Sequence, residues 1–237
     1  MRWGFSHSEL KTICNSVSKY EPKVKIDDST VSDVVDFLKD TELVEWLVPN
    51  FIAKKSIGFV AGLPETGKTW MVIDLAIEIA RPLTKIEQKL WMDKFSVSFG
   101  KVLFIDQERF KGETQRRFKA VIYGKGLTPK DLQDNLYIKC GTTTRLNLQH
   151  SFEAFRKELN EIRPDLVIID SFVTFHNKEE NNRTEIQEVL ERVKELRNEF
   201  GCTFLFIHHE NKNAFNTGPD VGEPSIAQMS GSIALSA

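Results

Sequence analysis

Residues 62–69 are Gly62-Leu63-Pro64-Glu65-Thr66-Gly67-Lys68-Thr69, and they fit the pattern G-x-x-x-x-G-K-[ST] at every position. The apolar run at 56–61 predicts a buried strand before them, and residues 70–80 repeat apolar side chains at helical spacing after them. A chance match in a surface turn would not need this flanking strand and helix. The stretch therefore predicts a phosphate-binding loop between a strand and a helix of an α/β fold.

The residue types of this loop suit a nucleoside triphosphate. Glycines let the backbone curl closely, so that its N–H groups can face phosphate oxygens. Lys68 supplies a point charge to the β- and γ-phosphates, and the Thr69 hydroxyl can ligate Mg²⁺.

Size and charge limit the class of protein. With 237 residues, the chain has room for one main α/β domain and a small appendage. Its 32 Lys and Arg nearly balance 34 Asp and Glu, so any polyanion must be bound locally rather than by global attraction. No apolar stretch approaches the roughly 18 residues of a membrane helix, and the N-terminus lacks the apolar core of a secretory signal. We expect a cytoplasmic protein with no membrane partner.

The three cysteines, Cys14, Cys140 and Cys202, are far apart and outside any C-x-x-C spacing. They indicate neither a disulfide framework nor a zinc site. We expect buried free thiols.

The first 43 residues predict a helical appendage and a linker. Ser6 and Glu9 stand at capping-box spacing, ahead of apolar residues that recur every three or four positions up to Tyr20. The polar stretch 23–30 follows, and then a second short helix is expected with Val31, Val34, Val35 and Leu38 on one face. We therefore divide the chain into a helical appendage (1–27), a linker with a short helix (28–43) and the main domain (44–237).

From Val44 onward, strands and helices alternate. Apolar runs predict strands at 101–105, 136–139, 166–169 and 203–207, and helical spacing predicts helices near 113–123, from Thr128, and at 152–162 and 186–200. We expect a mixed segment at 82–100 that carries a loop rich in exposed charge, and a polar, mobile loop at 218–232. Strands that are apolar on both faces indicate a mainly parallel sheet with helices on both faces, and a ligand crevice at the carboxyl ends of the strands.

Asp170 follows the strand predicted at 166–169, and it is the candidate Walker B acid. A carboxylate there would bind the water shell of a metal ion beside the triphosphate. Many strand-ending Asp residues are only turn residues, but one placed about a hundred residues after a phosphate loop is more specific. We expect Thr69 and Asp170 to be the metal-binding residues.

Two further acids, Asp106 and Glu108, follow the strand predicted at 101–105. Hydrolysis needs a group that orients and deprotonates water in line with the γ-phosphate, and Glu108 is our choice. Strand alternation would place Asp106 on the same side as Glu108, which makes Asp106 the rival. The alternative is that both acids are solvated loop residues paired with Arg109.

His208 and His209 follow the strand predicted at 203–207. Adjacent residues of an extended chain point in opposite directions, so the two are a poor pair for one metal ion. His209 could donate a hydrogen bond to the γ-phosphate and signal its loss to the following loop. A polar residue without that role is the alternative, and we expect His208 to be structural.

Together these residues resemble the RecA-like ATPase core, and most closely the branch with RepA-type hexameric replicative helicases and related primase-helicases. The resemblance covers roughly residues 44–237 and rests on GLPETGKTW at 62–70, VLFIDQE at 102–108, LVIIDSF at 166–172, HHENK at 208–212 and GSIAL at 231–235. It implies ATP and Mg²⁺ as cofactors, Glu108 as catalytic base and His209 as γ-phosphate sensor. The candidate ATP-binding residues are then Gly62, Leu63, Pro64, Glu65, Thr66, Gly67, Lys68, Thr69 and Trp70.

The same resemblance implies partners. Members of that family form ring hexamers with ATP between subunits and mobile loops lining a channel for single-stranded DNA. Segments 175–183 and 211–230 are then the DNA-loop candidates, in which charged residues could track phosphates and aromatic residues could stack on bases, with ordinary solvated loop residues as the alternative. These candidates are Lys178, Arg183, Lys212, Phe175 and Phe215.

Residues 4–20 are similar to the helical end of primase C-terminal modules. This similarity makes a primase module a further candidate partner. A generic amphipathic helix is the alternative.

Two departures from the family pattern matter. Members commonly carry an Arg before the Gly-Ser pair, where this chain has Met229-Ser230 ahead of Gly231-Ser232. The family also continues beyond the point matching Ala237 into strands that carry an arginine finger. On this resemblance the sequence ends inside the ATPase core, and we expect it to bind ATP and to hydrolyse it poorly.

The favoured function is a motor. ATP binding would order the loops after Asp170 and His209, hydrolysis through Glu108 would release them, and the cycle would move single-stranded DNA. The catalytic candidates are Glu108, Lys68, Asp170 and His209. Two alternatives stay open: a RecA-like regulatory or recombination ATPase without unwinding activity, and an interaction module that uses ATP to set its shape.

Overall fold

The computed structural model describes residues 34–39, 43–82, 89–141, 143–176, 183–209 and 234–236. The chain divides between Leu43 and Val44 into two units. In the first unit the described helix is α2 (Val34–Lys39), which confirms the short helix expected there. The helix expected at 6–20 and the loop expected at 218–232 lie outside the described residues.

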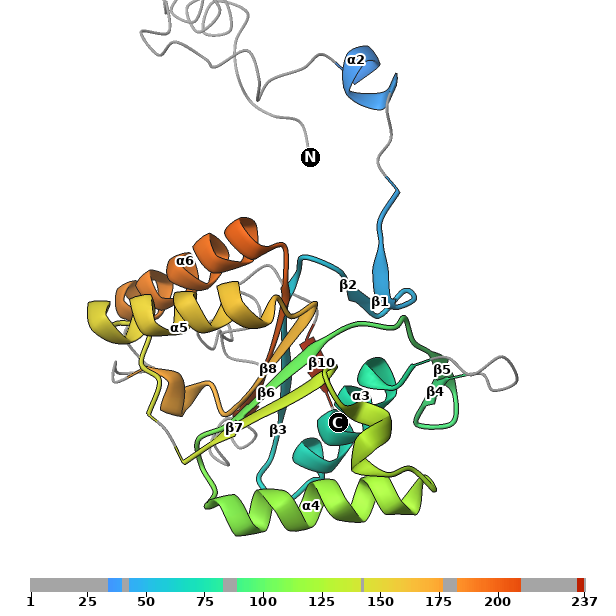
Figure 1. Cartoon of the computed structure of the whole chain (residues 1–237). Helices are drawn as coiled ribbons and strands as arrows, with labels where there is room; N and C mark the ends of the chain where they lie inside the picture. Colours follow the sequence, from blue (N-terminus) through green and yellow to red (C-terminus); the bar gives the residue numbers. More distant parts are fainter. Residues whose placement is uncertain are drawn as a thin grey trace, which may run out of the picture. The chain divides into compact units, whose positions relative to one another are not determined.

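The second unit contains a parallel sheet of six strands within the described residues, in the order β10-β3-β9-β8-β6-β7 (Figure 1). These strands are β3 (Ile57–Gly62), β6 (Val102–Asp106), β7 (Leu136–Cys140), β8 (Leu166–Asp170), β9 (Thr203–His209) and β10 (Ala234–Ser236). Strands β6 and β8 are buried along their whole length, because their continuous apolar runs face a core on each side of the sheet. The expected α/β fold with a mainly parallel sheet is confirmed.

Helices cover both faces of this sheet (Figure 1). Val102 and Phe104 face the core formed with α3 (Lys68–Ala80) and α4 (Lys111–Gly124). Leu103 and Ile105 alternate with them and face the core formed with α5 (Gln149–Ile162) and α6 (Arg183–Phe200).

Helix α3, at the centre of one face, is more enclosed than its amphipathic pattern predicts. Ile77 and Glu78 are buried along with the expected apolar face. The helix has neighbours on several sides, since it contacts strands of the sheet, α4 and β4 (Leu90–Trp91). The sequence pattern therefore identified the helix correctly and underestimated its burial.

The mixed segment expected at 82–100 contains short strands in its described part. Residues 89–100 include an antiparallel pair, β4 with β5 (Phe95–Ser96). Trp91 is buried there and donates a hydrogen bond from Nε1 to the Met71 carbonyl at 3.1 Å. Such two-residue strands are too short to show the alternation that identifies a strand in a sequence.

A second short antiparallel pair precedes the sheet, β1 (Trp46–Val48) with β2 (Ile52–Ala53). The Phe51 ring in its turn stacks on Phe95 and meets the edge of Trp91, at centroid distances of 5.2 and 5.9 Å. The two strand pairs therefore pack against each other through aromatic rings.

The carboxyl ends of the strands bring the candidate residues to one edge of the sheet. Strand pairing places Asp106 beside Asp170, and Gly62 beside His209. Strands β9 and β8 lie between β3 and β6, so Glu108 does not follow a strand adjoining that of the phosphate loop. The crevice expected at this edge is where the site is assembled.

Two cysteines are described, and both are free thiols. Cys202 is buried as expected, and burial raises its pKa from 9.0 to about 12. Cys140 is only half-buried, and Cys14 lies outside the described residues. No helix in the described ranges is long and apolar enough to cross a membrane.

Candidate functional site

The phosphate loop joins β3 to α3 and has an open tip. Residues 64–67 are exposed, while Lys68 and Thr69 beneath them are buried. Gly67 precedes α3 with a φ of 88°, which a residue with a Cβ adopts only under strain. In the described part of the chain no side chain caps α3, so its first N–H groups and its positive dipole end remain available to an anion.

Lys68 is positioned by the loop itself. Its ammonium donates hydrogen bonds to the carbonyls of Gly62, at 2.7 Å, and Leu63, at 2.5 Å. Both acceptors are neutral groups, which orient the ammonium without neutralising its charge. The loop therefore presents a positioned cation at the place where the sequence predicts phosphate binding.

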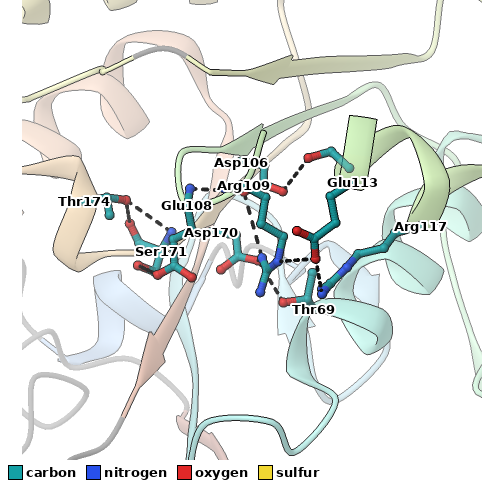
Figure 2. A network of polar contacts seen from close by, with 10 residues as sticks. Thr69, Asp106, Glu108, Arg109, Glu113, Arg117, Asp170, Ser171 and Thr174 are labelled. Carbon is teal, nitrogen blue, oxygen red and sulfur yellow. Dashed lines mark hydrogen bonds and ion pairs between the residues drawn. The ribbon is translucent and has the colours of Figure 1, made fainter. Parts of the chain in front are cut away.

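Thr69 and Asp170 are 101 positions apart in sequence and directly hydrogen-bonded (Figure 2). The Thr69 hydroxyl donates to Asp170 Oδ2 at 2.8 Å. Asp170 is fully buried, and its Oδ1 accepts no hydrogen bond from any residue that the structure describes. Burial raises the pKa of Asp170, and the Thr69 hydrogen bond and the Arg109 charge oppose that rise.

These two residues fit a magnesium ion. A hydroxyl and a carboxylate with a spare oxygen are the hard oxygen donors that Mg²⁺ takes, usually while it keeps several waters. The structure thus brings the two predicted metal residues together, and the buried Oδ1 of Asp170 is an acceptor that a metal-bound water could satisfy.

The two rival acids after β6 have different surroundings (Figure 2). Asp106 is buried, and it accepts hydrogen bonds from the backbone N–H groups of Glu108 (3.2 Å) and Arg109 (3.1 Å) and from the Thr114 hydroxyl (2.8 Å). Glu108 is exposed, and its carboxylate accepts a hydrogen bond from the Ser171 hydroxyl just after β8. Asp106 therefore anchors the turn, while Glu108 is the acid that water can reach.

The expectation that strand alternation places both acids on one side stays a prediction. Strand β6 ends at Asp106, and the chain bends at Glu108 and Arg109. Once the extended conformation ends, the two-residue period no longer predicts the direction of a side chain.

Arg109 was not among the predicted site residues, yet it lies against the metal candidates (Figure 2). Its Nη1 lies 2.9 Å from Asp170 Oδ2 and 3.9 Å from Asp106 Oδ1, and its Nε lies 3.5 Å from Glu113 Oε1. In the alternative of solvated acids paired with Arg109, the solvation is wrong for Asp106, which is buried, while its ion pair with Arg109 is confirmed.

Arg117 is the second basic residue that the sequence did not identify. Its Nη2 lies 2.8 Å from the same Glu113 oxygen, and its guanidinium lies over the Trp70 ring at 5.5 Å from the centroid. Both arginines line a cavity of about 290 Å³ together with residues 65–70. The i,i+4 spacing of Glu113 and Arg117 predicts a helix-surface ion pair, but it does not show that this face of α4 lies beside the phosphate loop.

The two histidines end β9, with His208 paired to Ala61 and His209 to Gly62 in the sheet register. His209 thus lies at the first residue of the phosphate loop by its backbone, although its side chain is outside the described part. His208 is half-buried. Within the described ranges, no three His, Cys, Asp or Glu side chains form a group that could bind a metal ion by themselves.

One DNA-loop candidate is contradicted. Phe175 lies in the 3₁₀ helix η2 (Val173–Phe175), is fully buried, and packs on Phe155 and Phe206 at centroid distances of 5.4 and 6.0 Å. It cannot stack on a base without leaving the core. The side chains of the other candidates, Lys178, Arg183, Lys212 and Phe215, lie outside what the structure describes.

The chain also matches a known protein family. A family model described as an AAA domain matches residues 20–214. The match includes the phosphate loop, both acids after β6, Asp170 and the end of β9.

Proposed function

The chain belongs to the AAA-domain family, and from this premise we propose that it is the ATP-binding and hydrolysing motor domain of a replicative DNA helicase or primase-helicase that acts on single-stranded DNA. The observation that carries the ATPase part is the hydrogen bond between Thr69 and Asp170, directly beneath a phosphate loop with a buried, oriented lysine. A purely structural turn would need neither the buried lysine nor the buried carboxylate, because both cost free energy to bury.

The loop residues would bind the triphosphate. The N–H groups at the start of α3 would donate to its oxygens, and the Lys68 ammonium, oriented by the loop carbonyls, would supply positive charge beside them. Thr69 and Asp170 would hold Mg²⁺, which neutralises charge on the phosphates when bound. The Arg117 guanidinium and the Trp70 ring close one side of the same cavity.

Glu108 would orient the attacking water and accept its proton. Its exposure leaves the carboxylate accessible, and the hydrogen bond from Ser171 directs it towards the end of β8. His209, at the neighbouring strand end, would sense the γ-phosphate.

The helicase part of the proposal rests on the five sequence segments that resemble RepA-type helicases. By that resemblance, the domain would act in a ring hexamer around single-stranded DNA, alone or beside a primase module. The buried Phe175 drops out as a DNA contact, while the other residues of segment 175–183 and segment 211–230 stay DNA-loop candidates.

The test is ATP hydrolysis by the chain, measured with and without single-stranded oligonucleotide over a range of salt concentrations. A motor on DNA predicts stimulation that falls steeply with salt, since phosphate contacts release counterions. Glu108→Gln should lower turnover by at least about a hundredfold, the scale of general-base catalysis, while ATP binding is retained.

Glu161→Gln, an exposed carboxylate at the end of α5, is the matched control and should keep wild-type turnover. Unchanged turnover in Glu108→Gln would exclude Glu108 as the base. Hydrolysis that DNA does not stimulate would refute the helicase proposal and favour the regulatory ATPase.

A further inference from the structure

Arg109 supplies a positive charge to the buried Asp170 carboxylate. It begins in the turn after β6 and reaches the end of β8, where its Nη1 lies 2.9 Å from Asp170 Oδ2. That oxygen also accepts the Thr69 hydroxyl hydrogen bond. The guanidinium therefore contacts the same carboxylate oxygen that is directed at the Thr69 hydroxyl.

Three carboxylates surround this guanidinium and keep it in place. Asp170 is nearest, Glu113 lies 3.5 Å from Nε, and Asp106 lies 3.9 Å from Nη1. The Arg109 side chain is only 18% exposed, so these interactions are weakly screened by solvent. Its fork of donors suits two acceptors in one plane.

A divalent cation between Thr69 and Asp170 would compete with this guanidinium. Thr69 and Asp170 would hold the metal ion, and the Asp170 oxygen that accepts the Thr69 hydrogen bond is also the one that Arg109 contacts. A metal ion and the Arg109 guanidinium beside the same buried carboxylate would repel each other strongly, because little solvent screens the two charges there. The displaced guanidinium need not leave the site, because Arg109 also lines the cavity beside the phosphate loop.

We propose that Arg109 is a resident counter-ion of the metal site, which pairs with Asp170 while nucleotide is absent and exchanges with Mg²⁺ when the nucleotide enters, moving towards its phosphates. The inference rests on the proposed ATP site and deepens it. It makes Arg109 a positioning residue that couples metal binding to nucleotide binding.

The coupling is measured by calorimetric titration of a nonhydrolysable ATP analogue, once with Mg²⁺ and once with EDTA. The readout is the ratio of the Kd in EDTA to the Kd in Mg²⁺, and no turnover is involved. In Arg109→Gln the metal meets no competitor at Asp170, and without metal the Asp170 carboxylate lacks its counter-ion and repels the phosphates, so the ratio should rise about tenfold, the scale of one charge-assisted hydrogen bond. Arg116→Gln removes an exposed charge from α4, the helix that follows this turn, and should leave the ratio unchanged.

Arg109→Lys provides a second variant if the glutamine variant does not fold. A lysine keeps the charge but lacks the planar set of N–H donors, so its ion pair with Asp170 should be weaker. The ratio should then rise about two- to threefold. A wild-type ratio in both Arg109 variants would overturn the exchange and leave the ATP site standing. A wild-type chain that binds no nucleotide in either buffer would refute the proposed function, and the exchange with it.

Discussion

Replacing Asp106 with alanine removes one buried carboxylate that accepts three hydrogen bonds. Its donors are two backbone N–H groups of the turn, from Glu108 and Arg109, and the Thr114 hydroxyl of α4. With a net cost of about 1 kcal/mol for each lost hydrogen bond, Asp106→Ala should lower the free energy of unfolding by about 3 kcal/mol. Turnover should fall as well, because the turn that presents Glu108 loses its anchor.

Urea unfolding monitored by circular dichroism checks this magnitude in a graded series. Thr114→Val removes one of the three hydrogen bonds and should cost about 1 kcal/mol, whereas Glu108→Gln alters an exposed side chain and should cost less than about 0.5 kcal/mol. Asp106→Asn keeps one acceptor oxygen and should lie between wild type and alanine.

Two results would refute this reasoning. One is an Asp106→Ala variant as stable as wild type, since three hydrogen bonds would then contribute nothing. The other is a stable Asp106→Asn variant without hydrolysis beside a Glu108→Gln variant that still turns over ATP. That pattern would make Asp106 the base and Glu108 the solvated residue.

Three further predictions concern buried groups away from the catalytic carboxylates. Phe175→Ala should lower the free energy of unfolding by about 3–5 kcal/mol, as expected for a fully buried ring, and a urea midpoint close to wild type would contradict its place in the core. Burial lowers the pKa of Lys89 from 10.5 to about 8, so the unfolded chain binds more protons between these values and stability should increase as pH rises through that window. Thermal melts of Lys89→Met should lack this rise; an identical pH profile would exclude Lys89 as its source. Because burial raises the pKa of Cys202 to about 12, a thiol reagent at pH 8 should modify the half-buried Cys140 before it modifies Cys202. Mass spectrometry follows the two reactions, and equal rates would show that the Cys202 site opens easily.

The sheet and its helices could be predicted because their patterns are local. Runs such as 166–169 are apolar at every position, and the apolar spacing of α5 and α6 repeats within a few turns. The phosphate loop is likewise contiguous, so its glycines, Lys68 and Thr69 identify themselves by spacing. The two-residue strands around Trp91 were not predicted, because a strand that spans a single period shows no repeating pattern.

The partners of the site residues depend on contacts between distant parts of the chain. Asp106 and Asp170 end neighbouring strands of similar sequence, and only the bend after β6 makes one an anchor and brings Arg109 onto the other. The direction of a side chain beyond a strand end follows from the hydrogen bonds that the turn forms, and the acceptor that Arg109 finds, Asp170, lies 61 positions away in sequence. Residue type and spacing thus identified which acids matter in this protein, while three-dimensional packing assigned each of them its partner.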